Sequence, residues 1–163
     1  MIVRDASEAD LPAIVEIYNA ATATRISTAL LDPVSVEERL PWFNRHSPDR
    51  FPLWVAEIDE QVVGWLSFHE FIRRPAYHGS AEISIYVNEK FRRRGIGRAL
   101  LTKAIAVAPR LNARVLVGYV LGHNEASLRL FEQAGFGQWG RLPRLARFEN
   151  AERDLVIVGR HVA

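Results

Sequence analysis

Four arginines and two glycines lie close together near the middle of the chain, in the order Arg92, Arg93, Arg94, Gly95, Ile96, Gly97, Arg98. Glycine adopts left-handed or tightly turned conformations and places no side chain between its amide and a docking ligand. The first N–H groups of a helix lack partners and lie at the positive end of its dipole. Such groups bind phosphate or pyrophosphate, and guanidinium groups add charge and donors around it. The segment therefore predicts an anion-binding loop.

The residues on either side predict the strand and the helix that would position this loop. Residues 81–87 (AEISIYV) alternate in side-chain type, as a half-buried β-strand does. Ile83 and Ile85 would share one face, and Glu82 and Tyr86 the other. Residues 96–105 repeat apolar side chains at helical spacing, which indicates an amphipathic helix. We therefore expect a strand, a basic loop and a helix, in that order.

Other interpretations compete for the glycine loop. A dinucleotide-binding fingerprint needs a third glycine and an acidic residue after the following strand. A phosphate loop of the nucleotide-hydrolase kind needs Gly-Lys-Ser or Gly-Lys-Thr, whereas Gly97 is followed by Arg98. An ordinary arginine-rich turn, with glycine for backbone geometry only, stays open on the loop alone.

The same residues carry a resemblance to a known family. Residues 92–97 (RRRGIG) fit the Arg/Gln-x-x-Gly-x-Gly/Ala signature of the GNAT acyltransferase superfamily. The resemblance extends over IVRDASEADLPAIVEIYN at residues 2–19, LWVAEIDEQVVGWLSF at 53–68 and NEASLRLFEQAGF at 124–136. Within this superfamily, the sequence most resembles the phosphinothricin-type branch, whose members acetylate the amino group of amino acids or their analogues. The resemblance implies acetyl-CoA as co-substrate and a homodimer.

The chain is expected to form one α/β domain spanning residues 1–163, with helices flanking a mixed sheet. Patterning predicts strands at residues 2–4, 53–58, 62–69, 81–87, 115–120, 136–140 and 155–159. Helices are expected from Ser7, from Ser35 with a kink or split at Pro41, from Ile96, and over residues 124–134. Residues 19–32 predict a loop or a broken helix. The resemblance implies the GNAT fold, mostly antiparallel, whose central strands splay apart to admit the pantetheine arm.

Composition narrows the class of protein. The 163 residues, 48% hydrophobic and 25% charged, suit an ordinary globular protein, and a net charge of +2 gives nucleic-acid binding no general support. No apolar run is long enough to span a membrane. The absence of cysteine excludes disulfides and thiolate chemistry, and with the acidic N-terminal segment it favours a cytoplasmic protein. The five histidines show no ligand spacing, so no metal is expected.

Acyl transfer to an amine requires a base that deprotonates the amine and donors that stabilise negative charge on the thioester oxygen. The resemblance carries the branch's catalytic glutamate to Glu82, which could otherwise be an ordinary strand residue. It places the thioester carbonyl beside the backbone amides of Ile85, Tyr86 and Val87. Burial in a cleft would raise the pKa of Glu82.

Two further groups receive roles from the resemblance. Asn124, with Ser127, would hold the pantetheine arm, although Asn124 also fits a helix N-cap. Arg73, Arg74 and Tyr77 would shape the acceptor pocket, where an arginine can pair with a carboxylate. Solvent-exposed loop arginines are the alternative.

The sequence departs from the family at two positions. Phe131 stands where relatives carry tyrosine or histidine that could protonate the leaving thiolate, and Arg93 replaces the usual first glycine of the loop. The proton would then come from water, from the substrate ammonium, from Tyr86 or from Tyr119.

The sequence predicts an acetyl-CoA-dependent N-acetyltransferase acting on a small primary amine, an amino acid or analogue such as phosphinothricin or methionine sulfoximine, by direct transfer. The alternatives are a protein or antibiotic acetyltransferase and a non-catalytic module that binds acyl-CoA as a sensor.

Overall fold

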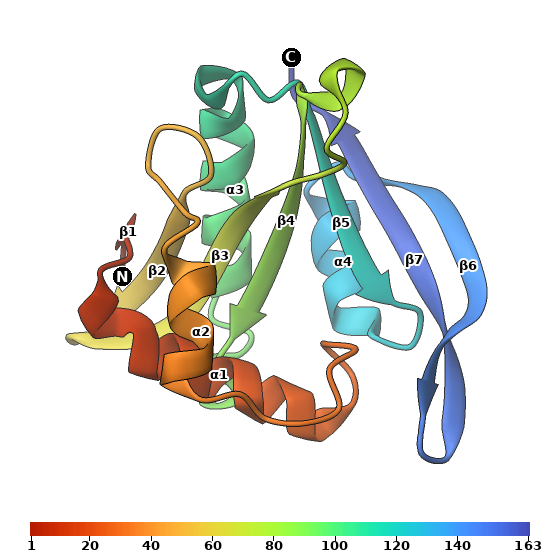
Figure 1. Cartoon of the computed structure of the whole chain (residues 1–163), viewed down its shortest axis with the longest axis horizontal. Helices are drawn as coiled ribbons and strands as arrows, with labels where there is room; N and C mark the ends of the chain where they lie inside the picture. Colours follow the sequence, from red (N-terminus) through yellow and green to blue (C-terminus); the bar gives the residue numbers. More distant parts are fainter.

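A computed structural model describes all of residues 1–163 and contains one seven-stranded sheet in the order β1-β2-β3-β4-β5-β7-β6 (Figure 1). Neighbouring strands are antiparallel except β4 and β5, which are parallel. The predicted mixed, mostly antiparallel sheet is confirmed. The strands are β1 (Ile2–Asp5), β2 (Leu53–Ile58), β3 (Gln61–Glu70), β4 (Ser80–Val87), β5 (Val115–Leu121), β6 (Gly137–Phe148) and β7 (Ala151–His161).

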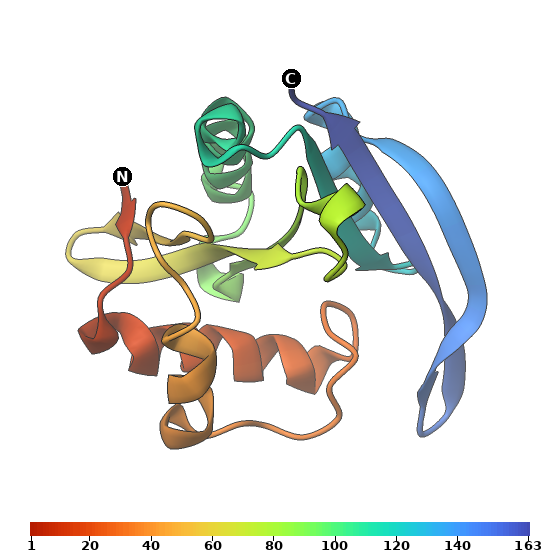
Figure 2. The ribbon, with the colours of Figure 1, turned by 45° about the horizontal axis from the view of Figure 1, so that its top comes forward.

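Helices cover both faces of the sheet. Figure 2 shows α1 and α2 on one face and α3 and α4 on the other. The α-helices are α1 (Leu11–Thr24), α2 (Val36–Phe43), α3 (Ile96–Val107) and α4 (Glu125–Gln133), and the 3-10 turns are η1 (Glu8–Asp10), η2 (Pro75–Tyr77), η3 (Glu89–Phe91) and η4 (Ala108–Leu111). None of the helices is both long enough and apolar enough to cross a lipid bilayer.

The alternation of β4 divides its side chains between two hydrophobic cores. Ile83 belongs to the larger core, which the sheet forms with α3 and α4. Tyr86 packs against the smaller core, which contains Tyr18 of α1, Trp42 of α2 and Trp65 of β3. Glu82 has the same parity as Tyr86 and therefore lies on the face that α1 and α2 cover.

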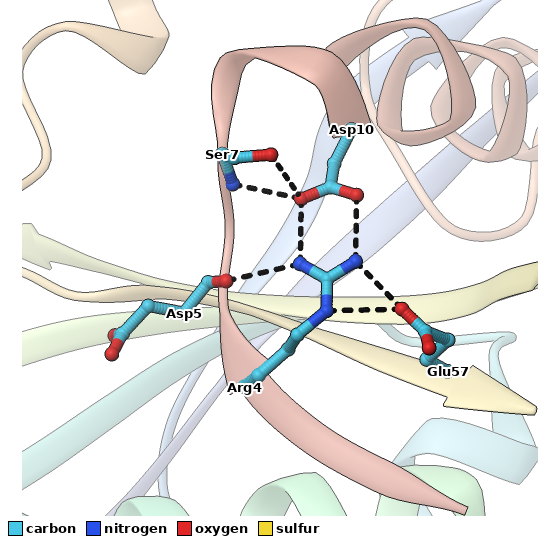
Figure 3. Close-up of polar contacts among 5 residues, drawn as sticks. All are labelled: Arg4, Asp5, Ser7, Asp10 and Glu57. Atoms are coloured by element: carbon cyan, nitrogen blue, oxygen red, sulfur yellow. Dashed lines mark hydrogen bonds and ion pairs between the residues drawn. The ribbon is translucent and has the colours of Figure 1, made fainter. Parts of the chain in front are cut away.

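An ion-pair network fixes the start of α1 (Figure 3). The Arg4 guanidinium donates to the Asp10 carboxylate at 2.8 and 2.9 Å and to Glu57 of β2 at 2.7 and 3.0 Å. Asp10 also accepts from the N–H and hydroxyl of Ser7 at 2.7 and 3.0 Å. These bonds, those from Arg4 above all, hold the pKa of the buried Asp10 at about 2. A helix was expected to start at Ser7, and Ser7 does form a capping box with Asp10, but this box caps the 3-10 turn η1 and α1 begins at Leu11.

Three expectations about the elements hold only in part. Residues 19–32 were expected to form a loop or a broken helix, but α1 continues to Thr24. Ala21 and Thr22 are buried, and the Thr22 hydroxyl donates to the Tyr18 carbonyl, which stabilises this last part of the helix. Helix α2 contains Pro41 without splitting there, and it ends two residues later at Phe43. Strands β6 and β7 extend far beyond the predicted ranges, since pairing between them organises residues 141–154, which carry no alternating pattern.

Candidate active site

A slot opens in the sheet where its two parallel strands separate. β4 and β5 pair only at Ser80–Val115, Ala81–Leu116 and Glu82–Val117, although both strands continue beyond these pairs. Figure 1 shows the carboxyl-terminal halves of the two strands diverging. The splaying that the resemblance implied is therefore confirmed. Since successive strand residues direct their backbone groups to alternate edges, every second residue after Glu82 turns its N–H and C=O toward the opening.

The slot is lined by β4, β5 and α4, with one contribution from the loop after α1. Predicted residues from distant parts of the chain, Ile85 and Tyr86 on one side and Asn124 and Ser127 on the other, meet here. A slot lined by both apolar side chains and polar groups suits an extended chain of methylene and amide groups. The full lining is Ser27, Ile83, Ser84, Ile85, Tyr86, Tyr119, Val120, Asn124, Ser127 and Phe131.

Asn124 caps α4 and also lines the slot. Its Oδ1 accepts from the Ser127 N–H at 3.2 Å, which caps α4. The side chain is buried at the wall of the slot, and its Nδ2 has no hydrogen-bond partner in the protein. The capping bond therefore leaves an amide donor for a ligand in the slot.

Glu82 is half-buried at the last pair before the strands separate, and burial raises the pKa of its carboxyl. Burial, and after it the charge of Glu82, raise the pKa of Tyr119 on β5. Tyr86 has a raised pKa as well, through burial first and then through neighbouring Tyr18. Both phenols border the slot and keep their protons at neutral pH.

The glycine loop leads directly into α3. Gly95 is the N-cap residue with a left-handed φ of 77°, and a Cβ added to it would meet no atom within 4 Å. The space above the helix N-terminus is therefore open to a ligand. A Cβ on Gly97 would lie 2.9 Å from Cδ2 of Leu130 in α4. The first glycine serves backbone conformation and access, and the second serves helix packing.

The loop arginines are exposed. Arg92 lies 4.0 Å from Glu89, Arg94 stacks on Phe91 at 5.0 Å from the ring centre, and Arg98 forms no ion pair. Arg93, which replaces the family's usual glycine, has a left-handed φ of 60°. The backbone at Arg93 therefore has the left-handed conformation that glycine adopts easily, and a residue with a side chain adopts it at a cost in conformational free energy.

Arg73, Arg74 and Tyr77 lie outside the slot. They are exposed on the segment that leads into β4, and Arg73 pairs with Glu70 at 3.3 Å. Conversely, sequence reasoning missed Ser27, because a serine in a loop carries no signal of its own. Phe131 is buried at the slot, in edge-to-face contact with Phe136 at 5.0 Å, and offers no proton.

The arrangement fits acetyl-CoA. The slot can hold the pantetheine arm with Asn124, and the N-terminus of α3 with its arginines can hold the diphosphate. Residues 11–136 match the family described as "Acetyltransferase (GNAT) family". The chain therefore belongs to this family and is an acetyl-CoA-dependent acetyltransferase.

The chain is similar over most of its length to individual relatives and solved structures. Over the full length of both chains, the protein is 44% identical to "Putative phosphinothricin acetyltransferase YwnH" of Bacillus subtilis. It is 31% identical to the "L-methionine sulfoximine/L-methionine sulfone acetyltransferase" of Pseudomonas paraeruginosa, with 89% of this chain and 85% of the relative covered. A crystal structure of a phosphinothricin acetyltransferase from Sinorhizobium meliloti in complex with acetyl-CoA has a TM-score of 0.93 at 28% identity, covering 98% of this chain and 87% of that chain.

Proposed function

We propose that this acetyltransferase transfers the acetyl group of acetyl-CoA directly to the primary amine of a small molecule, an amino acid or a close analogue, with Glu82 as the general base. The observation that carries the proposal is the position of Glu82. It is half-buried and free of any ion pair, and it forms the last β4–β5 pair, directly before the slot-lining residues Ile83–Tyr86. The names of the relatives support an amino-acid analogue as acceptor.

Glu82 has the properties that the first step requires. An aliphatic amine is mostly protonated at neutral pH, and it must lose a proton before it can attack a thioester. Because burial raises the pKa of Glu82, its carboxylate is a stronger proton acceptor than an exposed glutamate. No cation pairs with it and weakens this effect.

The remaining residues bind and orient. Backbone N–H groups on the open edge of β4, among Ile85, Tyr86 and Val87, would stabilise negative charge on the thioester oxygen. The Nδ2 of Asn124 would donate to an amide of the pantetheine arm. The first-turn amides of α3 would bind the diphosphate.

The leaving thiolate needs a proton that Phe131 cannot give. Tyr119 and Tyr86 border the slot and stay protonated at neutral pH, so both are candidate donors beside water and the acceptor's own ammonium group. Transfer without an acyl-enzyme agrees with a chain that has no cysteine.

Other expectations remain proposals. Arg73, Arg74 and Tyr77 would contact the acceptor carboxylate from the exposed segment before β4. A homodimer is supported by the resemblance to the phosphinothricin-type branch, and a cytoplasmic location by the composition of the chain.

The decisive test measures thiol release from acetyl-CoA with a panel of free amino acids, methionine sulfone, methionine sulfoximine, phosphinothricin, polyamines and a basic peptide. We expect turnover on an amino acid or analogue, and a loss of about 10²- to 10⁴-fold in kcat for Glu82→Gln. The matched control is Glu152→Gln, which changes an exposed strand glutamate in β7 and should leave kcat unchanged.

The alternatives predict different results. Preference for the basic peptide would indicate a protein acetyltransferase. Binding of acetyl-CoA without thiol release on any amine would refute the enzymatic proposal and support a sensor, in which Phe131 marks lost chemistry. Full activity in Glu82→Gln would remove Glu82 as the base.

A further inference from the structure

Trp139 differs from the other tryptophans in its exposure. Trp42, Trp54 and Trp65 are buried, whereas Trp139 on the edge strand β6 is 48% exposed. The pairing of β6 with β7 is irregular at this residue, because Gln138 pairs with Val158 and Gly140 pairs with Ile157. Trp139 is thus the extra residue of a β-bulge, a device that redirects a side chain out of the regular alternation.

The redirected indole lies flat on a glycine. A Cβ placed on Gly159 of β7 would lie only 2.0 Å from Cε3 of Trp139 and 2.3 Å from two more atoms of the same ring. No side chain larger than hydrogen is compatible with this ring position. A Cβ on Gly137, the partner of Gly159 across the strands, would be 3.6 Å from the indole Nε1. The bulge, these two glycines and the His161 ring, whose centre lies 5.3 Å from that of the indole, together hold the ring in place.

The ring is on the face of the sheet that carries Glu82. Gly159 pairs with Val117, and Val117 pairs with Glu82. Directly paired residues of neighbouring strands point to the same face, so the Cβ direction of Gly159, which the indole occupies, is also the direction of the Glu82 side chain. Two strand spacings separate Glu82 from Gly159, or about 10 Å. Val117 between them is a small apolar residue that is buried, and Tyr119 on the same face is 41% exposed.

We propose that the exposed indole of Trp139 is the wall against which the side chain of the acceptor packs. This inference rests on the proposed function, with the acceptor amine at Glu82. A span of about 10 Å is one that an amino acid can bridge when its amine meets Glu82 and an unbranched side chain extends toward the ring. A flat aromatic face favours apolar or thioether chains through dispersion and sulfur contacts. Trp139 therefore selects amino acids with an extended, unbranched side chain over short ones.

The test compares L-methionine with L-alanine as acceptors, because the two share the amine and carboxylate and differ only in the side chain. For Trp139→Ala we expect the ratio of kcat/KM for methionine to that for alanine to fall about tenfold. The loss should be in the KM for methionine, with kcat and the KM for acetyl-CoA within about twofold of the wild type. Trp139→Phe should retain part of the preference.

Two further variants keep the test independent of a folding defect. Gly159→Ala leaves the tryptophan in the chain but displaces its ring, and should lower the same ratio. Leu145→Ala removes a 59% exposed side chain from the same strand and should leave the ratio unchanged.

The outcomes are separable. A wild-type enzyme that acetylates amines without preferring methionine to alanine overturns the inference. An equal loss of kcat/KM on both acceptors in Trp139→Ala also overturns the inference. If light scattering shows that this variant forms a smaller assembly than the wild type, the ring is a subunit contact instead. Absence of turnover on every amine is the failure of the proposed function itself, and the inference falls with it.

Discussion

Gly95 allows the sharpest test of the anion-binding loop. Alanine at this position must adopt a left-handed φ of 77°, which costs roughly 1 kcal/mol. The new Cβ meets no protein atom within 4 Å, so no clash adds to that cost. We expect the Tm of Gly95→Ala to fall by about 2–4 °C for a chain of this size.

The effect on acetyl-CoA should be larger than the effect on folding. The added methyl group enters the space above the N-terminus of α3, where we place the diphosphate. Losing one hydrogen bond to a charged group costs about 1.5–3 kcal/mol, which corresponds to a rise of roughly 10- to 100-fold in the Kd for acetyl-CoA. Titration calorimetry measures this directly. Acetyl-pantetheine has no diphosphate, so its kcat/KM should stay at the wild-type value.

Gly135→Ala is the matched control. Gly135 has a φ of 80° beyond the end of α4, and its nearest neighbour is the flexible Nη1 of Arg160 at 2.8 Å. The variant should lose similar stability and bind acetyl-CoA normally. If Gly95→Ala lowered the Tm but bound acetyl-CoA as tightly as the wild type, the placement of the diphosphate at α3 would be refuted.

Two predictions concern stability. Because burial raises the pKa of Glu82, its ionised form opposes folding above the unfolded-state pKa of about 4.3. Glu82→Gln should therefore resist urea more than the wild type at pH 7, with the advantage shrinking as pH falls toward about 4; an advantage independent of pH would contradict this. Asp10, held at a pKa of about 2 by its bonds from Arg4, stabilises the fold above its unfolded-state value, and that contribution is lost as pH falls through 2. Asp10→Asn should lose about 1–3 kcal/mol at pH 7 and less at pH 2, while Asp32→Asn, at an exposed position, should match the wild type throughout.

Local patterns predicted most elements because each acts over a few residues. The alternation of residues 81–87 gave β4, and the Ser35–Glu38 capping box is present at the start of α2 with bonds of 2.7 and 3.1 Å. The predicted strands 53–58 and 62–69 pair as neighbours, and the turn between them at Asp59 and Glu60 has both residues at positive φ. The same local rules failed for the last turns of α1 and for most of β6, where burial and strand pairing outweigh residue preference.

The sequence by itself determined the glycine loop before α3, the face on which Glu82 lies, the cap at Asn124 and, through them, the family. These features depend on residue type and short spacing, so they can be read along the chain. Only the tertiary structure decided where β4 and β5 separate, that Ser27 borders the slot, that Arg73 stays outside it, and that Trp139 is turned onto Gly159. Those features depend on pairing and packing between segments far apart in the sequence, for which the local sequence carries no signal.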